Sequence, residues 1–147
     1  MPTCEKNQVF TDIVLEIFKL GGLLVQEGDR MGSAYGISSA RWKVLGALSL
    51  AGQAQTASQI AQSMGLTRQA VQRLVDVMSA DGLLVFHDNP QHKRAKLISL
   101  STEGQEVYAQ LASIQKAWAS QCTSGIQQAE LETTMAVLRK LSQILDT

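Results

Sequence analysis

Arginine and glutamine side chains are concentrated in one short stretch of this 147-residue chain. When residues 67–80 are placed on a helical wheel at about 100° per residue, one side carries no apolar residue and is formed by Arg68, Gln69, Gln72, Arg73 and Asp76. Arginine can donate two hydrogen bonds to a guanine edge in a DNA major groove, and glutamine can pair in the same way with adenine. An ordinary solvated helix face would look the same in isolation, so the neighbouring elements must decide between the two interpretations.

The other side of this helix is apolar, which predicts a face packed against a core. Its members are Ala70, Val71, Leu74, Val75, Val77 and Met78. A shorter helix is expected over residues 57–64, after Thr56, and Gly65 can adopt the positive φ of a tight turn. Thr67 can cap the longer helix. The pattern is that of a helix-turn-helix, although any helical hairpin in a bundle would share it.

A β-hairpin is predicted directly after this pair of helices. Residues 83–88 and 94–100 are apolar and β-prone, and residues 89–93 have the composition of a turn. The hairpin tip carries His92, Lys93 and Arg94. Basic loops are common by chance, but the order helix, turn, helix and hairpin is typical of a DNA-binding domain with a wing.

Long helices are expected on both sides of this central region. The first covers residues 8–31 and is apolar around much of its circumference, so it needs burial on more than one side, most simply against a second chain. A second helix should begin at Ser38 or Ser39, carry the apolar series 42, 44, 45, 48 and 50, and stop at Gly52. Near the C-terminus, Leu131, Leu138 and Leu145 form a seam with the spacing of helix-on-helix packing.

The expected fold class is therefore mainly α with a small β-hairpin wing. We divide the chain into an N-terminal dimerisation helix (1–37), a winged helix-turn-helix domain (38–100) and C-terminal dimerisation helices (101–147). The whole chain is formally neutral, but residues 38–100 hold seven basic and three acidic residues, a net charge of +4. The remainder must carry −4, an asymmetry that favours a polyanionic partner for the middle of the chain.

Composition excludes several other classes of protein. Two cysteines, Cys4 and Cys122, provide neither a disulfide framework nor a metal-binding spacing. No signal-like segment and no apolar run of about 20 residues is found, so we expect a cytoplasmic protein without a membrane span. Nucleophile-elbow, phosphate-loop and metalloprotease motifs are absent, which indicates that the chain is not an enzyme and needs no cofactor or metal.

Five segments, in order and correctly spaced, resemble the multiple antibiotic resistance regulator (MarR) family of transcription factors. They are Ile37-Ser-Ser-Ala-Arg-Trp-Lys-Val-Leu45, Ala57-Ser-Gln-Ile-Ala61, Met64-Gly-Leu-Thr-Arg-Gln-Ala-Val71, Asp81-Gly-Leu-Leu84 and Asn89-Pro-Gln-His-Lys-Arg-Ala-Lys-Leu-Ile-Ser-Leu-Ser-Thr-Glu-Gly104. The resemblance implies a homodimer that binds a pseudo-palindromic duplex. It also implies a repressor that a small aromatic or phenolic effector releases from DNA.

Specific roles follow for the polar residues. Base edges would be read by Arg68, Gln69, Gln72 and Arg73, phosphates would be held by Thr67, Ser58 and Lys93, and the wing would place Arg94, beside His92, in a minor groove. His92 stands where the family commonly has a carboxylate that orients this arginine. If His92 nears a phosphate, DNA binding would favour its protonated form and strengthen as the pH falls. The alternative is a winged-helix module for protein–protein contact, without specific DNA binding.

Overall fold

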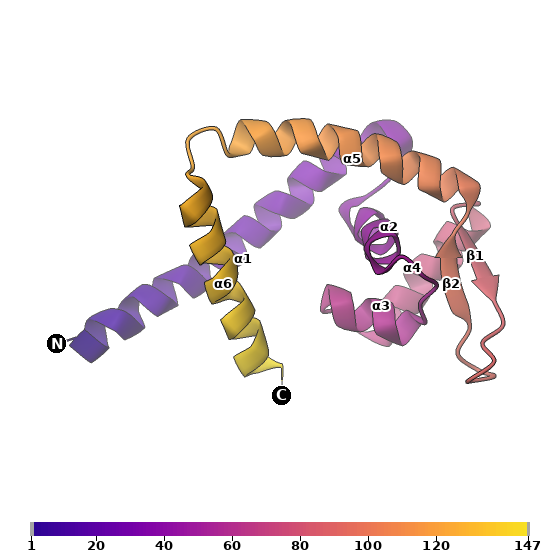
Figure 1. The fold of residues 1–147 in the computed structure, drawn as a ribbon, viewed down its shortest axis with the longest axis horizontal. Coiled ribbons are helices and arrows are strands. Elements are labelled where there is room, and N and C mark those ends of the chain that lie inside the picture. Colours follow the sequence, from indigo (N-terminus) through magenta and orange to yellow (C-terminus); the bar gives the residue numbers. More distant parts are fainter. Residues whose placement is uncertain (1, 147) are drawn as a thin grey trace. The chain divides into compact units, whose positions relative to one another are not determined.

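The computed structural model of the chain describes residues 2–146, with side chains from residue 5 onward. In chain order the elements are α1 (Pro2–Gly32), the short 3₁₀ turn η1 (Ser33–Tyr35), α2 (Ser39–Ala51), α3 (Ala57–Met64), α4 (Arg68–Ala80), β1 (Leu84–His87), β2 (Leu97–Leu100), α5 (Thr102–Cys122) and α6 (Gln128–Leu145) (Figure 1). Contacts divide the chain into two compact units, Met1–Leu111 and Ala112–Thr147. The mainly helical class with one antiparallel hairpin is confirmed.

The predicted helix-turn-helix is formed by local hydrogen bonds at its helix ends. Thr56 and Gln59 make a capping box at the start of α3, in which each side chain accepts the other residue's backbone N–H. Gly65 then takes a φ of +67°, a left-handed conformation that costs glycine little. At the start of α4 the N–H of Ala70 donates to Thr67 Oγ1 at 3.1 Å. The expected roles of Gly65 and Thr67 are thus confirmed.

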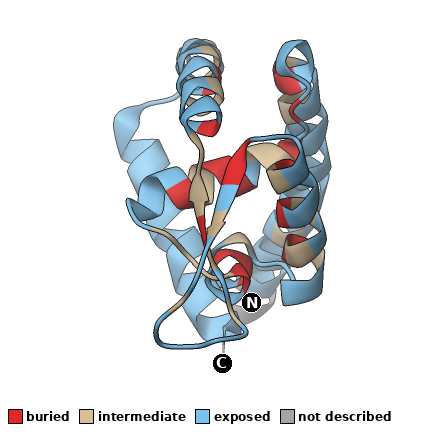
Figure 2. Cartoon of the chain, turned by 90° about the vertical axis from the view of Figure 1, so that its right-hand side faces the viewer, coloured by how far each residue is buried: buried red, intermediate tan, exposed pale blue. Residues whose placement is uncertain are grey.

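The core of the first unit is built on the inner faces of α2, α3 and α4. The fully covered side chains include Val44 and Leu45 of α2, Ile60 of α3, and Val71, Val75 and Met78 of α4. In Figure 2 the buried positions, in red, are concentrated on the sides of the helices and strands that face other elements, and the outward sides are exposed. The hydrophobic packing fixes α4 with its polar side outward, because a helix rotated about its axis would bury arginine.

Two apolar assignments were wrong. Val77 is 47% exposed, and Leu50 is 86% exposed. Val77 lies about 120° around the helix from Val71 at 100° per residue, at the edge of the buried arc. Leu50 lies nearly opposite the buried face of α2. The predicted apolar side of α4 was too wide at Val77, and the apolar series of α2 included Leu50 without regard to its angular position.

The wing is a short antiparallel ladder that is joined to the helices by one further bridge. Leu84 pairs with Leu100, and Phe86 pairs with Ile98. Gln55, just before α3, exchanges two backbone hydrogen bonds with Ile98, at 2.9 and 2.7 Å. This bridge ties the wing to the start of α3, so the hairpin and the helix-turn-helix are positioned by one hydrogen-bond network.

Helix α1 is clamped to the start of α2. Ser38 is the N-cap of α2, accepting the N–H of Arg41. The neighbouring Ser39 is buried, its N–H donates to Asp29 Oδ1 at 2.7 Å, and its hydroxyl donates to the carbonyl of Val25 at 2.6 Å. Both of these hydrogen bonds of Ser39 are made to α1. They fix the C-terminal end of α1 against the winged domain.

The helices at the two ends of the chain expose much of their apolar surface. Helix α1 begins earlier than the predicted residue 8, and its N-terminal part runs away from α2–α4 (Figure 1). Its apolar side chains stay largely uncovered, Leu15 at 62% and Phe18 at 74% exposure. In the second unit, α6 has no buried residue, and Leu131, Leu138 and Leu145 are all exposed.

Candidate nucleic-acid interface

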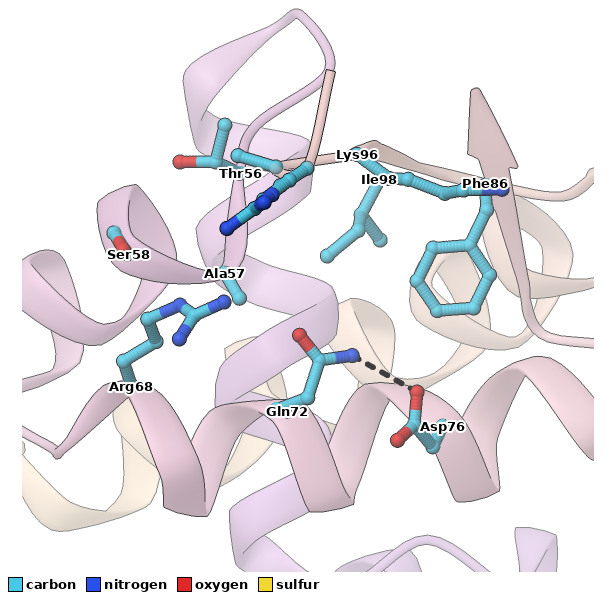
Figure 3. Close-up of a pocket in the computed structure, with 11 residues that line it drawn as sticks. Thr56, Ala57, Ser58, Arg68, Gln72, Asp76, Phe86, Lys96 and Ile98 are labelled. Carbon is cyan, nitrogen blue, oxygen red and sulfur yellow. Dashed lines mark hydrogen bonds between the residues drawn. The ribbon is translucent and has the colours of Figure 1, made fainter. Parts of the chain in front are cut away.

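A groove of about 430 Å³ lies where α3, α4 and the wing meet. It is lined by Thr56, Ala57, Ser58, Arg68, Gln72, Asp76, Phe86, Arg94, Ala95, Lys96 and Ile98 (Figure 3). Two of its apolar lining residues, Phe86 and Ile98, come from the two strands, and its polar lining includes three basic residues, Arg68, Arg94 and Lys96, and one acidic residue, Asp76. A concave surface with cationic walls, bordered by an exposed helix face, suits a strand of the DNA backbone better than a globular protein surface.

Four of the predicted contact residues meet in this groove. Ser58 comes from α3, Arg68 and Gln72 from α4, and Arg94 from the wing. Residues from three separate segments therefore converge in the groove. A helical wheel could place only Arg68 and Gln72 side by side, because the other two residues lie outside α4.

The remaining predicted residues lie outside the lining of that groove. Gln69 and Arg73 are exposed on α4, Thr67 is occupied as the cap of α4, and Lys93 is exposed at the wing tip. His92 lines a second cavity of about 450 Å³, together with Thr56, Gln59, Asn89, Pro90, Gln91 and Leu97. The predicted set is thus split between the groove, the outer surface of α4 and the tip of the wing.

One acidic side chain in the groove was assigned no role by the sequence. The amide Nε2 of Gln72 donates to Asp76 Oδ1 at 2.9 Å, one helical turn further along α4 (Figure 3). Ionised carboxylate oxygens only accept hydrogen bonds, so this bond fixes which end of the amide faces Asp76. Gln72 Oε1 is left as the acceptor available to an incoming group.

Thr56 and Lys96 were also missed as groove residues. Thr56 caps α3, and the first turn of a helix presents backbone N–H groups that favour an anion. The sequence carried a signal for this end, since Thr56-x-x-Gln59 is a capping-box pattern. Lys96 comes directly before β2, and its spacing from Arg94 carried no such signal, because residues 93–95 form a turn and a bend rather than an extended strand.

Within residues 5–146, the basic side chains that line the groove form no ion pair. Arg41, counted in the basic excess, pairs with Asp81 at 2.9 Å on another part of the domain. On α1, the hydrogen bond and then the charge of Glu27 raise the pKa of Arg30. Neither pair includes Arg68, Arg94 or Lys96, which therefore face solvent as positive charges.

The described part of the chain holds neither a cluster of metal-binding side chains nor a helix suited to a membrane. No three His, Cys, Asp or Glu side chains there lie close enough to hold a metal ion. None of the described helices has the length and apolar character that crossing a membrane requires. Cys122 is exposed in the single chain, and the side chain of Cys4 lies outside the described residues.

Comparison with known proteins agrees with this geometry. A sequence model described as MarR family matches residues 35–95. Uncharacterised proteins from Mycobacterium bovis and Mycobacterium tuberculosis are 30% identical over 129 residues, which is 88% of this chain and 89% of theirs. The chain belongs to the MarR family of winged helix-turn-helix transcription regulators.

Solved structures share the fold over nearly the whole chain. A MarR/EmrR family transcriptional regulator from Acinetobacter sp. ADP1 has a TM-score of 0.83 at 22% identity, covering 94% of this chain and 97% of its own. The S. aureus MepR–DNA complex gives a TM-score of 0.77 at 22% identity, covering 88% of this chain and 93% of that one. The MarR fold of this chain thus combines a wing with a helix-turn-helix, and its function is that of a DNA-binding transcription regulator rather than an enzyme.

Proposed function

We propose that the protein is a cytoplasmic homodimeric repressor that binds a pseudo-palindromic operator and is released by a small aromatic or phenolic effector. The observation that carries the DNA-binding part is the groove in which Ser58, Arg68, Gln72 and Arg94 converge from α3, α4 and the wing. In this proposal the exposed side of α4 enters a major groove, where Arg68, Gln69, Gln72 and Arg73 meet base edges.

The remaining polar residues position the domain on the phosphate backbone. Thr67, Ser58 and Lys93 hold phosphates, which orient the protein without specifying sequence. Arg94 enters the flanking minor groove, where a narrow A·T-rich segment has enhanced negative potential. Support comes from the bridge between Gln55 and Ile98, because it holds the wing and α3 in one frame.

Exposed apolar surface supports the homodimer. Soluble monomers rarely leave contiguous apolar patches uncovered, yet Phe18 of α1 is 74% exposed and Leu145 of α6 is 78% exposed. Both helices belong to the segments assigned to dimerisation. A second copy of the chain would cover them and would place two recognition helices about one helical turn, ~10 bp, apart on the duplex.

Repression and release rest on family membership. An effector that prefers one arrangement of the two winged domains would shift the population toward that arrangement. If the preferred arrangement does not match the half-site spacing, the DNA affinity falls. A screen of phenolic compounds that never shifts operator affinity would remove this part of the proposal and leave the DNA-binding part intact.

The decisive experiment selects the preferred duplex from a random pool and follows its affinity against salt concentration. A protein that neutralises several phosphates loses affinity linearly on a log–log plot, with a slope near −0.9 per phosphate. Lys93→Ala should make this slope shallower by about one, while Lys116→Ala, an exposed lysine on α5, should leave it unchanged. A salt-independent affinity, or no preferred sequence, would favour the protein–protein alternative.

A further inference from the structure

The tip of the wing is held closed by two of its own side chains, Asn89 and His92. The N–H groups of Arg94 and Ala95 both point at His92 Nδ1, at 3.3 and 3.1 Å. Asn89 Nδ2 donates to the carbonyl of Ala95 at 3.0 Å, and Asn89 Oδ1 accepts the N–H of Gln91 at 3.0 Å. The backbone of Ala95 is therefore fixed on both of its polar groups.

Ala95 lies between the two basic side chains that the wing contributes to the groove. Arg94 and Lys96 flank it in sequence, and all three residues line the groove beside Arg68. Fixing the backbone at Ala95 sets the direction in which both basic side chains leave the chain. Arg94 and Lys96 are themselves exposed and make no ion pair in the described part of the chain, so the backbone bonds at Ala95 are what fix the points from which these side chains start.

The bonding pattern also determines the protonation state of the ring. A backbone N–H can only donate, so His92 Nδ1 must be an acceptor, and the neutral ring then carries its proton on Nε2. A proton added at Nδ1 would replace the acceptor by a donor and would break both bonds. The closed tip therefore requires neutral His92.

We infer that His92 is a pH-sensitive positioning residue for Arg94. Its neutral imidazole closes the wing tip, and its protonation opens the tip. This inference rests on the proposed DNA-binding role of the wing, and it reverses the direction expected from the sequence, where a phosphate near His92 would favour the charged ring. When the tip is open, Arg94 is held less firmly. Its contact with the minor groove then contributes less to the preference for A·T-rich flanks.

The cavity beside the ring is lined by neutral side chains. The other residues lining its cavity are Thr56, Gln59, Asn89, Pro90, Gln91 and Leu97, none of which titrates. The charged groups nearby in sequence are Asp88, Lys93, Arg94 and Lys96 of the same loop. The chain's other histidine, His87, bonds Ser99 Oγ through Nε2 at 2.7 Å within the ladder, so experiments need variants that retain it.

Two variants, compared with the wild type, separate closure of the tip from the charge and from the shape of the ring. His92→Asn retains a neutral acceptor that can bond the N–H two residues on, but it does not titrate. His92→Phe retains a ring without an acceptor. Both keep His87, so pH dependence that survives in His92→Asn belongs to other groups.

The first measurement uses the free dimer and needs no DNA. In nuclear magnetic resonance spectra of wild type, the amide signals of Arg94 and Ala95 should move together with the His92 ring between pH 8 and 5.5. In His92→Asn they should stay at closed-tip positions, and in His92→Phe they should stay open at every pH. A neutral His92 ring that carries its proton on Nδ1, or amide signals that ignore the ring, would overturn the inference.

The second measurement compares the affinities for two operators that differ only in A·T-rich or G·C-rich flanks. An added positive charge strengthens both affinities equally, so their ratio reports on the wing alone. Going from pH 8 to pH 5.5, the ratio should fall roughly three- to tenfold in wild type, stay constant in His92→Asn and be low throughout in His92→Phe. A ratio that rises or stays flat in wild type would overturn the inference. Absent binding at every pH would instead refute the proposed function, and the spectra of the free dimer would still decide the behaviour of the tip.

Discussion

The exposed side of α4 and the exposed length of α1 differ in what they need from a partner. The α4 side is polar, with Arg68, Gln69 and Arg73 open to solvent, and water solvates these groups well. The α1 surface is apolar, with Leu15 at 62% and Phe18 at 74% exposure, and each Å² left in water costs roughly 25 cal/mol. The polar surface is therefore stable in water without a partner, whereas the apolar surface is the one that the proposed homodimer would cover.

The largest expected effect comes from breaking the apolar surface. Phe18→Glu should dissociate the dimer and cost about 2–4 kcal/mol of association free energy, as the loss of a buried aromatic anchor does at other interfaces. Lys19→Glu, the next residue and also exposed, changes charge without removing apolar area and should leave the dimer intact. Sedimentation at micromolar concentration measures both variants. A folded wild-type monomer under these conditions would refute the assignment of α1.

The polar surface should respond in specificity rather than in assembly. Arg68→Ala or Gln72→Ala should each cost about 1–3 kcal/mol of operator binding and relax the preference at particular base pairs. Thr67→Ala should weaken all sequences more evenly and, because Thr67 caps α4, should also cost about 1 kcal/mol of stability. Thr67→Ser preserves the cap and serves as its control. If the selected consensus is unchanged in both α4 variants, the helix faces the DNA with another side.

Most of the winged domain could be predicted because its signals are local. Gly65 and Thr67 mark a turn and a cap by their own conformational chemistry, and the polar side of α4 follows from residue spacing. The bond between Gln72 and Asp76 could also have been found, since residues four apart face each other on a helix.

Other contacts depend on distances that sequence does not contain. Ser39 and Asp29 meet only because α2 turns back against α1. The closed wing tip depends on the path of an irregular loop, in which His92 Nδ1 accepts the N–H groups of the residues two and three positions further on. Contacts within a regular helix, cap or turn are thus readable from the sequence, whereas pairings created by an irregular path of the chain are not.

The junction between α1 and the winged domain should be sensitive to a single methyl group. A Cβ at Gly32 would lie 2.0 Å from the backbone carbonyl oxygen of Ile37, and backbone cannot rotate away. Gly32→Ala should therefore destabilise the protein by about 1–3 kcal/mol. Gly46→Ala in α2, outside the segments assigned to dimerisation, is the matched control, because a Cβ there would lie 3.8 Å from Tyr108, an ordinary van der Waals contact, and alanine in a helix should stabilise the protein by about 0.5–1 kcal/mol. Thermal unfolding at equal protein concentrations tests whether the two variants change the stability in opposite directions.

The smallest expected effect concerns Asp76. A substitution there can show whether Asp76 acts by orienting the Gln72 amide or through its negative charge. Asp76 accepts from Gln72 Nε2, so Gln72 Oε1 is presented to a base-pair donor. In Asp76→Asn the new side chain can donate as well as accept, and the glutamine amide can then turn either end outward.

In Asp76→Asn, the loss of a fixed orientation of the Gln72 amide should cost about 0.5–1 kcal/mol of discrimination at the base pair that Gln72 contacts. Removing a negative charge near phosphates should meanwhile strengthen binding to every sequence. Asp88→Asn removes a charge from an exposed loop position without touching Gln72, so it should produce the second effect alone. Binding to operators that vary only at that base pair separates the two effects. Equal discrimination in Asp76→Asn and Asp88→Asn would show that Asp76 acts through its charge and leaves the orientation of Gln72 to the DNA.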